Sequence, residues 1–170
     1  MTLVEKAKIF ATKAHKGQVR KYTGEPYIVH PIEVAEIVAR HNGSQEMIAA
    51  ALLHDVVEDT STTIEDIRSK FGNAVAMLVD DLTDVSKPED GNRAVRKAMD
   101  REHTAKASAA AMVIKAADLI SNSKSILEHD KNFAKVYIKE KSALLDVMFK
   151  IKEMDIFKEA QGVINERSIA

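Results

Sequence analysis

The chain contains no cysteine and no tryptophan, and its 170 residues include only three prolines and six glycines. The absence of cysteine excludes disulfide scaffolds, thiol nucleophiles and zinc sites with cysteine ligands. No apolar run approaches the roughly 20 residues that a membrane-spanning helix requires. The N-terminal residues alternate charged and apolar side chains, so we expect no signal peptide. These absences predict a soluble, cytoplasmic protein that does not interact with membranes.

The overall charge is close to neutral, with 25 basic and 26 acidic residues and a formal net charge of −1. This balance argues against a general nucleic-acid binder, which carries a clear basic excess. Apolar residues make up 45% and charged residues 30% of the chain, which is an ordinary globular composition. We therefore expect residues 1–170 to form a single domain, and the composition predicts no oligomeric state.

The charges are distributed unevenly along the chain. Residues 1–24 hold six basic side chains and one acidic one, whereas residues 46–66 hold six acidic side chains and no basic one. One interpretation is two solvated faces. The other is a site with an acidic half that binds a cation and a basic half that binds an anion. Charge alone leaves both interpretations open.

Apolar residues recur with helical spacing along almost the whole chain, and no strand-like run of alternating β-branched residues appears. Aromatic residues amount to only 5%. Thr62 and Glu65 have the spacing of a capping box, and the segments 17–26 and 86–92 have the composition of loops. The sequence thus predicts an all-α globule of roughly eight helices. They come from nine helical stretches, of which 62–71 is short: about 3–14, 31–41, 44–58, 62–71, 73–85, 92–106, 109–127, 132–153 and 155–167.

One predicted helix ends in the sequence His54-Asp55-Val56-Val57-Glu58-Asp59. Residues four apart lie on the same face of a helix, so a helix continuous to Glu58 stacks His54 beneath Glu58 and Asp55 beneath Asp59. Acidic residues at a helix C-terminus oppose the helix dipole. Their position therefore indicates a function, and the imidazole and carboxylates can hold a divalent cation and place acid–base groups beside it.

His30 precedes a predicted helix start at Pro31, and Asp118 lies in an otherwise apolar helical stretch with Asn122 one turn further on. Each residue taken singly has an ordinary structural interpretation, although a lone carboxylate in an apolar stretch is costly to bury unless it is paired or binds a metal. Together with His54 and Asp55 they form a mixed nitrogen and oxygen set that suits Mn²⁺, Fe²⁺ or Zn²⁺. The remaining histidines are expected to be solvated or satisfied surface residues: His15, His41, His103 and His129.

Two segments carry a resemblance to a known family. Residues 15–31, HKGQVRKYTGEPYIVHP, and residues 50–60, AALLHDVVEDT, resemble the hydrolase motifs of the RelA/SpoT alarmone family. That family belongs to the His-Asp (HD) superfamily of metal-dependent phosphohydrolases. The resemblance covers roughly residues 5–126, with the motifs in family order and at family-like spacing. From its length, the chain looks like the small alarmone hydrolases that have no synthetase or regulatory domain.

The resemblance implies roles for individual residues. It makes four residues the ligands of one Mn²⁺ ion: His30, His54, Asp55 and Asp118. It assigns Glu58 and Asp59 to orienting or deprotonating the attacking water, Arg20 and Lys21 to contacting the substrate, and Asn122 to a position near the nucleotide sugar. The implied reaction, part of the stringent response, removes the 3′-pyrophosphate of guanosine tetra- or pentaphosphate (ppGpp or pppGpp) with a metal-activated water, leaving GDP or GTP.

Two positions depart from the family pattern. Leu119 stands where the family usually has a basic residue, and Ser121 stands where tyrosine or histidine is common. Both positions lie near the nucleotide in the family. An alternative hypothesis is therefore an HD phosphohydrolase that acts on NADPH or another nucleotide, and a third is a non-catalytic nucleotide-binding module.

Overall fold

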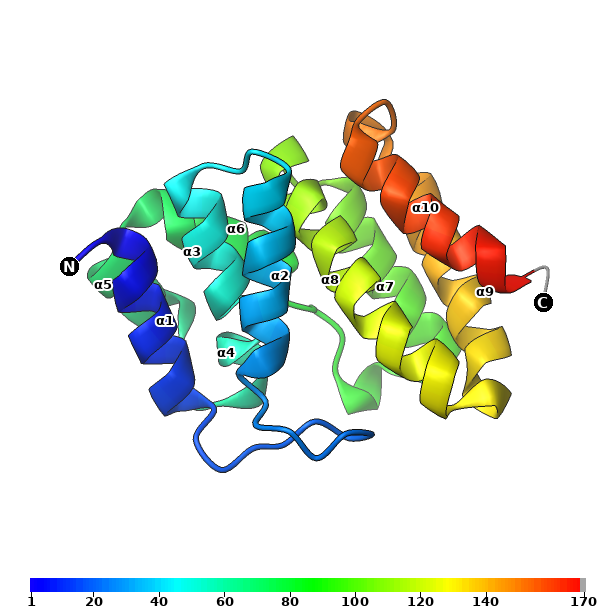
Figure 1. Cartoon of the computed structure of the whole chain (residues 1–170), viewed down its shortest axis with the longest axis horizontal. Coiled ribbons are helices and arrows are strands. Elements are labelled where there is room, and N and C mark those ends of the chain that lie inside the picture. The colour runs from blue at the N-terminus through cyan, green and yellow to red at the C-terminus, as the bar shows by residue number, and fades with distance from the viewer. Residues whose placement is uncertain (169–170) are drawn as a thin grey trace. The chain divides into compact units, whose positions relative to one another are not determined.

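The computed structural model describes residues 1–168 and confirms the all-α prediction (Figure 1). Within those residues the only β pairing is an isolated bridge between Val19 and Pro26. The chain divides into two compact units, Met1–Thr83 and the part from Asp84 onward. None of the helices in the described part of the chain combines the length and apolarity needed to cross a membrane.

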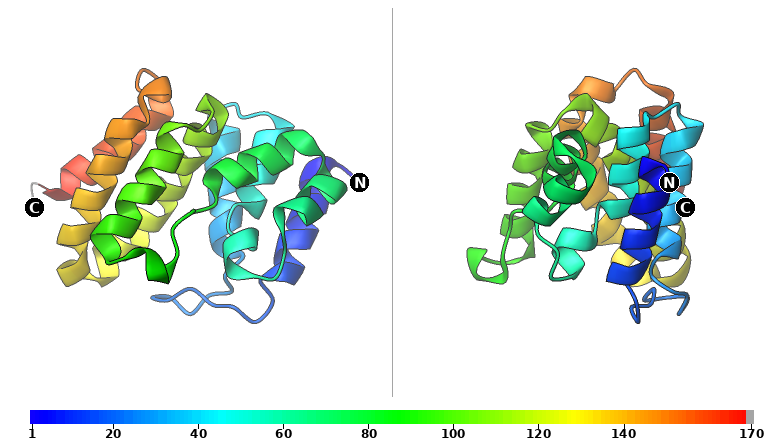
Figure 2. Two further views of the ribbon diagram at one scale, coloured as in Figure 1. Left: turned by 180° about the vertical axis from the view of Figure 1, so that it is seen from behind. Right: turned by 90° about the vertical axis from the view of Figure 1, so that its left-hand side faces the viewer.

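In the first unit, α3 is the central helix. It packs against α1, α2 and α6, and α5 packs against α6 (Figures 1 and 2). Five consecutive residues of α3, Ala49–Leu53, are buried, which explains why this helix lacks a polar face. The helices of this unit are α1 (Leu3–Ala14), α2 (Val29–Arg40), α3 (Gln45–Leu53), α4 (Val56–Asp59), α5 (Ile64–Phe71) and α6 (Asn73–Leu82).

Local signals set several of these helix boundaries. The turn between α2 and α3 requires Gly43, because a Cβ atom there would lie 2.4 Å from Cγ1 of Val38. Ser44 then caps α3 by accepting a hydrogen bond from the backbone N–H of Met47 at 3.2 Å. These contacts confirm the predicted helix start after Ser44.

The capping box predicted at Thr62 lies one residue later. Thr63 accepts a hydrogen bond from the N–H of Asp66, and the Asp66 carboxylate accepts one from the N–H of Thr63 at 2.9 Å. Thr62 instead donates its N–H to the hydroxyl of Thr60. The hydroxyl of Thr60 thus keeps Thr62 outside α5 and shifts the cap.

In the second unit, α8 packs against α9 and α10, and α7 packs against α9 (Figure 2). The long α8 has eleven buried residues and forms the core of this unit. The elements are η1 (Pro88–Asp90), α7 (Arg93–Ala105), α8 (Ala109–His129), α9 (Lys131–Val147), η2 (Phe149–Ile151) and α10 (Asp155–Ser168).

A bidentate salt bridge between Arg93 and Glu140 joins α7 to α9. The Arg93 guanidinium donates from Nε to Oε1 of Glu140 at 2.7 Å and from Nη2 to Oε2 at 3.0 Å. Desolvation raises the pKa of Glu140, but the hydrogen bonds and charge of Arg93, together with the charges of Lys97 and Lys141, outweigh it, so the pKa of Glu140 is lowered overall. The ionised form of Glu140 is therefore stabilised by folding.

We expect Glu140→Gln to lower the free energy of unfolding at pH 7 by about 1 kcal/mol or less, because Arg93 is half exposed to solvent. The folded-state pKa of Glu140 is depressed, so this stability is present above its ordinary value of 4.5 and is lost as the pH falls through the folded-state value. Urea unfolding of the variant and the wild type at several pH values checks this. Glu153→Gln, at an exposed position, is the control. If the difference in free energy of unfolding between Glu140→Gln and wild type stays constant down to strongly acidic pH, ionised Glu140 is not the source of the stability.

Candidate metal centre

The predicted continuous helix over 44–58 is wrong, because the structure breaks it at His54 and Asp55. Helix α3 ends at Leu53, and Asp55, with φ −100° and ψ −4°, precedes the single turn of α4. The His54 ring donates from Nδ1 to the carbonyl of Ala51 at 2.6 Å. In a continuous helix the Ala51 carbonyl accepts a hydrogen bond from the backbone N–H of Asp55. The imidazole of His54 therefore competes with that backbone hydrogen bond at the break.

The break brings three predicted ligands together. Nε2 of His54 lies 3.0 Å from Oδ2 of Asp55, and Nε2 of His30 lies 3.6 Å from the same oxygen. The ligand atoms of these three residues all lie within 4.8 Å of one another. His30 comes from the first turn of α2, next to Pro31, so the cluster joins the start of α2 to the junction between α3 and α4.

The backbone selects the form of His54 that can bind a metal. Because Nδ1 faces a carbonyl oxygen, which can only accept, Nδ1 carries the proton. In the neutral ring Nε2 then presents a lone pair, and it is Nε2 that faces Asp55. A histidine held in this way by a backbone carbonyl is the usual arrangement at metal sites.

The residues therefore fit a divalent cation. Both imidazoles are buried, with 1% of His30 and 3% of His54 exposed, and Asp55 is partly buried. Two imidazole nitrogens and one carboxylate oxygen suit Mn²⁺, Fe²⁺ or Zn²⁺. A cation at this position offsets the cost of placing a carboxylate among buried polar rings.

The predicted acid–base pair lies on the next turn. Glu58 and Asp59 end α4, and both side chains are exposed. Desolvation of the carboxyl group, followed by the negative charge of Asp55, raises the pKa of Asp59, while His15, His54 and His30 oppose the rise. A raised pKa makes the Asp59 carboxylate a stronger base.

The predicted basic pair lies in a hairpin-like loop between α1 and α2. Opposite sides of this loop are joined by hydrogen bonds from the N–H of Arg20 to the carbonyl of Glu25 at 2.8 Å and from the N–H of Tyr27 to the carbonyl of Gln18 at 2.9 Å. Lys21 is exposed, and its Nζ lies 5.2 Å from the centre of the Tyr22 ring. We call residues Gln18–Tyr27 the basic hairpin.

The other two predicted site residues lie in the second unit, on α8. Asn122 donates from Nδ2 to Oδ1 of Asp118 at 2.9 Å, one helical turn away. The structure thus pairs these two residues with each other. The positions that depart from the family pattern are both buried, with 1% of Leu119 and 2% of Ser121 exposed.

The prediction that His15 is a surface residue is wrong. Only 2% of His15 is exposed, its Nδ1 lies 2.8 Å from Oε1 of Gln18, and its ring packs 4.8 Å from that of Tyr27. The Tyr27 hydroxyl donates to Oδ2 of Asp55 at 2.5 Å. Sequence reasoning assigned no role to Gln18 or Tyr27, although both lie in the motif segment 15–31 that carries the family resemblance.

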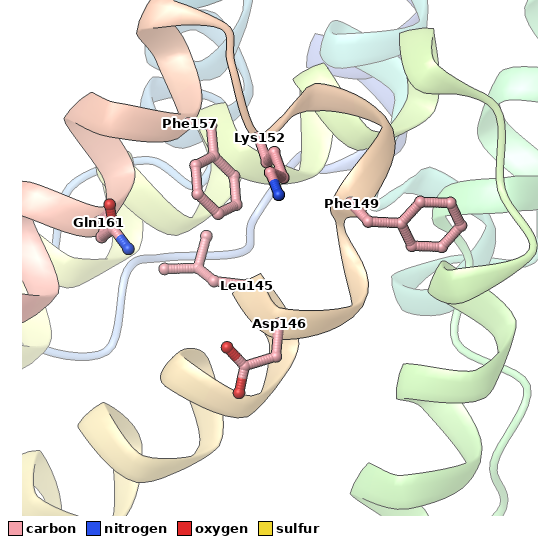
Figure 3. Close-up of a pocket in the computed structure, with 6 residues that line it drawn as sticks. All are labelled: Leu145, Asp146, Phe149, Lys152, Phe157 and Gln161. Atoms are coloured by element: carbon pink, nitrogen blue, oxygen red, sulfur yellow. The ribbon is translucent and has the colours of Figure 1, made fainter.

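The second unit contains a cavity of its own. It has a volume of about 430 Å³ and contains none of the predicted site residues (Figure 3). Its walls come from α9, η2, α10 and the turn before α10, through Leu145, Asp146, Phe149, Lys152, Phe157 and Gln161.

The family of the chain follows from a comparison with family models. The model described as "HD domain" matches residues 7–144. The His54-Asp55 pair at the break between α3 and α4 lies within the matched residues. The chain therefore belongs to the HD domain family.

Curated relatives match from about half to about three quarters of the chain. A guanosine-3′,5′-bis(diphosphate) 3′-pyrophosphohydrolase of Aquifex aeolicus is 49% identical over 84 residues, which are 49% of this chain and 12% of the relative. A GTP pyrophosphokinase of Streptomyces coelicolor is 38% identical over 124 residues, 72% of this chain and 14% of the relative. The chain thus spans only about a tenth to a seventh of the length of these proteins.

Solved structures match over a much larger share of their length. A metazoan orthologue of SpoT, described as hydrolysing ppGpp and acting in starvation responses, superposes with a TM-score of 0.88. The match covers 100% of this chain and 98% of that one, at 26% identity. A Listeria monocytogenes protein matches 86% of this chain and 98% of its own length, with a TM-score of 0.70 and 29% identity.

We expect His54→Gln to weaken Mn²⁺ binding by roughly 100-fold or more, because the variant removes the imidazole Nε2 that faces Asp55 in the cluster. Calorimetric titration of chelator-treated protein with Mn²⁺ measures the affinity. His129→Gln, at the exposed end of α8, is the matched control and should bind as the wild type does. Equal affinities of His54→Gln and wild type contradict the site.

Proposed function

We propose that this protein is a Mn²⁺-dependent hydrolase that removes the 3′-pyrophosphate of ppGpp or pppGpp and leaves GDP or GTP. The observation that carries the proposal is the cluster of His30, His54 and Asp55, with the His54 tautomer set for binding and Glu58 and Asp59 on the next turn. The metazoan orthologue of SpoT that matches the whole chain hydrolyses ppGpp, and several longer relatives are named as hydrolases of this nucleotide.

Other longer relatives are named for the opposite reaction, the GTP pyrophosphokinases. Since the chain matches only 11–14% of those proteins, their names do not decide which reaction belongs to the matched region. The metal cluster favours hydrolysis, because its imidazole and carboxylate groups are typical of hydrolytic metal sites.

We propose Asp118 as the fourth ligand of the same cation and Asn122 as a residue that contacts the nucleotide sugar. Both assignments rest on the sequence resemblance. The hydrogen bond from Asn122 to Asp118 supports them in part, because a carboxylate ligand is usually oriented by a partner of this kind. In the Mn²⁺ titration, Asp118→Asn should therefore bind more weakly than wild type.

Each group of residues contributes a separate part of the chemistry. A divalent cation held by the ligand set would lower the pKa of a bound water towards neutrality and would polarise a phosphoryl oxygen. Glu58 and Asp59, on the turn that follows Asp55, orient the attacking water and accept its proton. The water oxygen bonds to the phosphorus next to the ribose as the bond to the 3′ oxygen breaks.

Arg20 and Lys21 offset the negative charge of the polyphosphate. The Arg20 guanidinium can bind two phosphate oxygens at once, while the Lys21 ammonium acts as a point charge. Together they neutralise part of the negative charge of the polyphosphate, which otherwise repels the carboxylates of Asp55, Glu58 and Asp59. This division of labour corresponds to one of the two interpretations of the charge distribution, in which an acidic half binds a cation and a basic half binds an anion.

We expect chelator-treated protein to hydrolyse ppGpp only after Mn²⁺ is restored, with GDP and pyrophosphate as the products. Chromatography of the nucleotides checks this, with NADPH and other nucleotides tested in parallel. Phosphate release from NADPH without ppGpp cleavage supports the alternative substrate suggested by Leu119 and Ser121. Absence of turnover on the whole panel, with metal bound, supports the non-catalytic binding module.

We expect the double variant Glu58→Gln, Asp59→Asn to keep its affinity for Mn²⁺ and to lose turnover by about 100- to 10,000-fold, the range of a general base. Both substitutions preserve shape and remove only charge. Initial rates on ppGpp and the Mn²⁺ titration are measured on the same preparation. Turnover within a few-fold of wild type contradicts the role of this pair.

A further inference from the structure

Two side chains at the base of the basic hairpin reach the two ends of α4. The Tyr27 hydroxyl donates to Oδ2 of Asp55, at the start of α4, at 2.5 Å. The Gln18 amide donates from Nε2 to the backbone carbonyl of Asp59, at the end of α4, at 3.0 Å. Gln18 and Tyr27 are themselves paired across the hairpin by a backbone hydrogen bond of 2.9 Å.

Helix α4 needs outside support because it is a single turn of four residues, Val56–Asp59. Its backbone hydrogen bonds include those from the N–H of Asp59 to the carbonyl of Asp55 and from the N–H of Thr60 to the carbonyl of Val56. A helix this short is unstable alone, because the entropy of ordering its residues exceeds the gain from so few bonds. Contacts from other elements must therefore set the direction of its carboxylates.

His15, the C-cap residue of α1, holds Gln18 in place. Because Nε2 of Gln18 donates to a carbonyl, Oε1 is the amide atom that faces His15. Nδ1 of His15 must then be the donor in their 2.8 Å hydrogen bond. The ring is 98% removed from solvent and packs on Tyr27, so both hairpin contacts with α4 meet at this histidine.

We propose that His15, Gln18 and Tyr27 are positioning residues that fix the Asp55 carboxylate for the metal and the Asp59 carboxylate for the water. This proposal deepens the function proposed above and rests on it for its effect on turnover. The same contacts connect the basic pair to the carboxylates, because Arg20 and Lys21 lie on the hairpin whose base is bonded to α4.

The geometry leaves a competing role for His15. Its Nε2 is buried without a hydrogen-bond partner among the described residues, and with Nδ1 protonated it offers a lone pair. That atom can accept a hydrogen bond from substrate or water. The amide N–H of asparagine can replace the Nδ1 donor of histidine, and the amide oxygen of glutamine can accept a hydrogen bond near the position of Nε2, so the two roles predict rescue by different substitutions.

The first test uses Tyr27→Phe, which removes one hydroxyl and keeps the ring. We expect Mn²⁺ to bind about 10- to 100-fold more weakly, the usual cost of losing an outer-shell partner of a metal ligand. Tyr22→Phe, the other tyrosine of the basic hairpin, is the matched control and should leave Mn²⁺ affinity unchanged. Equal Mn²⁺ affinities for Tyr27→Phe and wild type overturn the assignment of Tyr27.

The second test concerns Asp59. We expect Gln18→Met and His15→Leu to lower kcat on ppGpp by roughly 10- to 100-fold with little change in KM, because misplacing a reacting group by about 1 Å costs this much. His15→Asn should recover most of the lost kcat, and His15→Gln should not. Rescue by glutamine instead of asparagine overturns the positioning role in favour of chemistry at Nε2.

A third readout needs neither metal nor substrate. Hydrogen exchange at the amides of Asp59 and Thr60 reports how often α4 opens. We expect Gln18→Met and Tyr27→Phe to speed exchange there by about tenfold, with exchange in α5 unchanged. If the wild type fails to cleave ppGpp but exchange at these amides is faster in the variants, the proposed substrate is wrong and the positioning role stands. If exchange is unchanged in the variants, the positioning role is overturned whatever the substrate.

Discussion

The site depends on a single carboxylate oxygen, Oδ2 of Asp55. It lies 3.0 Å from Nε2 of His54 and 3.6 Å from Nε2 of His30, and it accepts a hydrogen bond from Tyr27. Three elements of the first unit must be placed correctly for these groups to meet: the start of α2, the end of α3 and the basic hairpin. The packing of α1, α2 and α6 around α3 satisfies that requirement, because it fixes the junction at which Asp55 lies.

The break between α3 and α4 makes this convergence possible. A continuous helix separates neighbouring side chains by about 100° around its axis, whereas the turn at His54 and Asp55 brings the imidazole and carboxylate of adjacent residues within 3.0 Å. Periodicity over 44–58 gives no sign of the break, since Leu52, Leu53 and Val56 are all buried on either side of it. At the break, His54 donates a hydrogen bond to the Ala51 carbonyl, which is a side-chain contact that hydrophobic patterning does not encode.

The all-α class, most helix positions and the cluster of His30, His54 and Asp55 could be predicted from sequence. Helical spacing, caps and glycine turns are local signals, and the ligand residues have side chains of recognisable chemistry. The roles of His15, Gln18 and Tyr27 could not be predicted in this way, because they depend on contacts between residues up to 41 positions apart. Burial of His15 follows from the packing of its ring on Tyr27, which the charged residues around it in the sequence obscure.

The basic hairpin has a base and a tip with different tolerances to change. Gly24 adopts a left-handed conformation with φ +73°, and a side chain there meets no other atom within 4 Å, so space around the tip is open. The base, in contrast, is tied to α4 through Gln18 and Tyr27. Added atoms at the tip therefore meet no neighbour, whereas a change at Gln18 or Tyr27 removes a contact with α4. The hairpin can thus carry bulk at its tip while its base keeps the single turn of α4 in place.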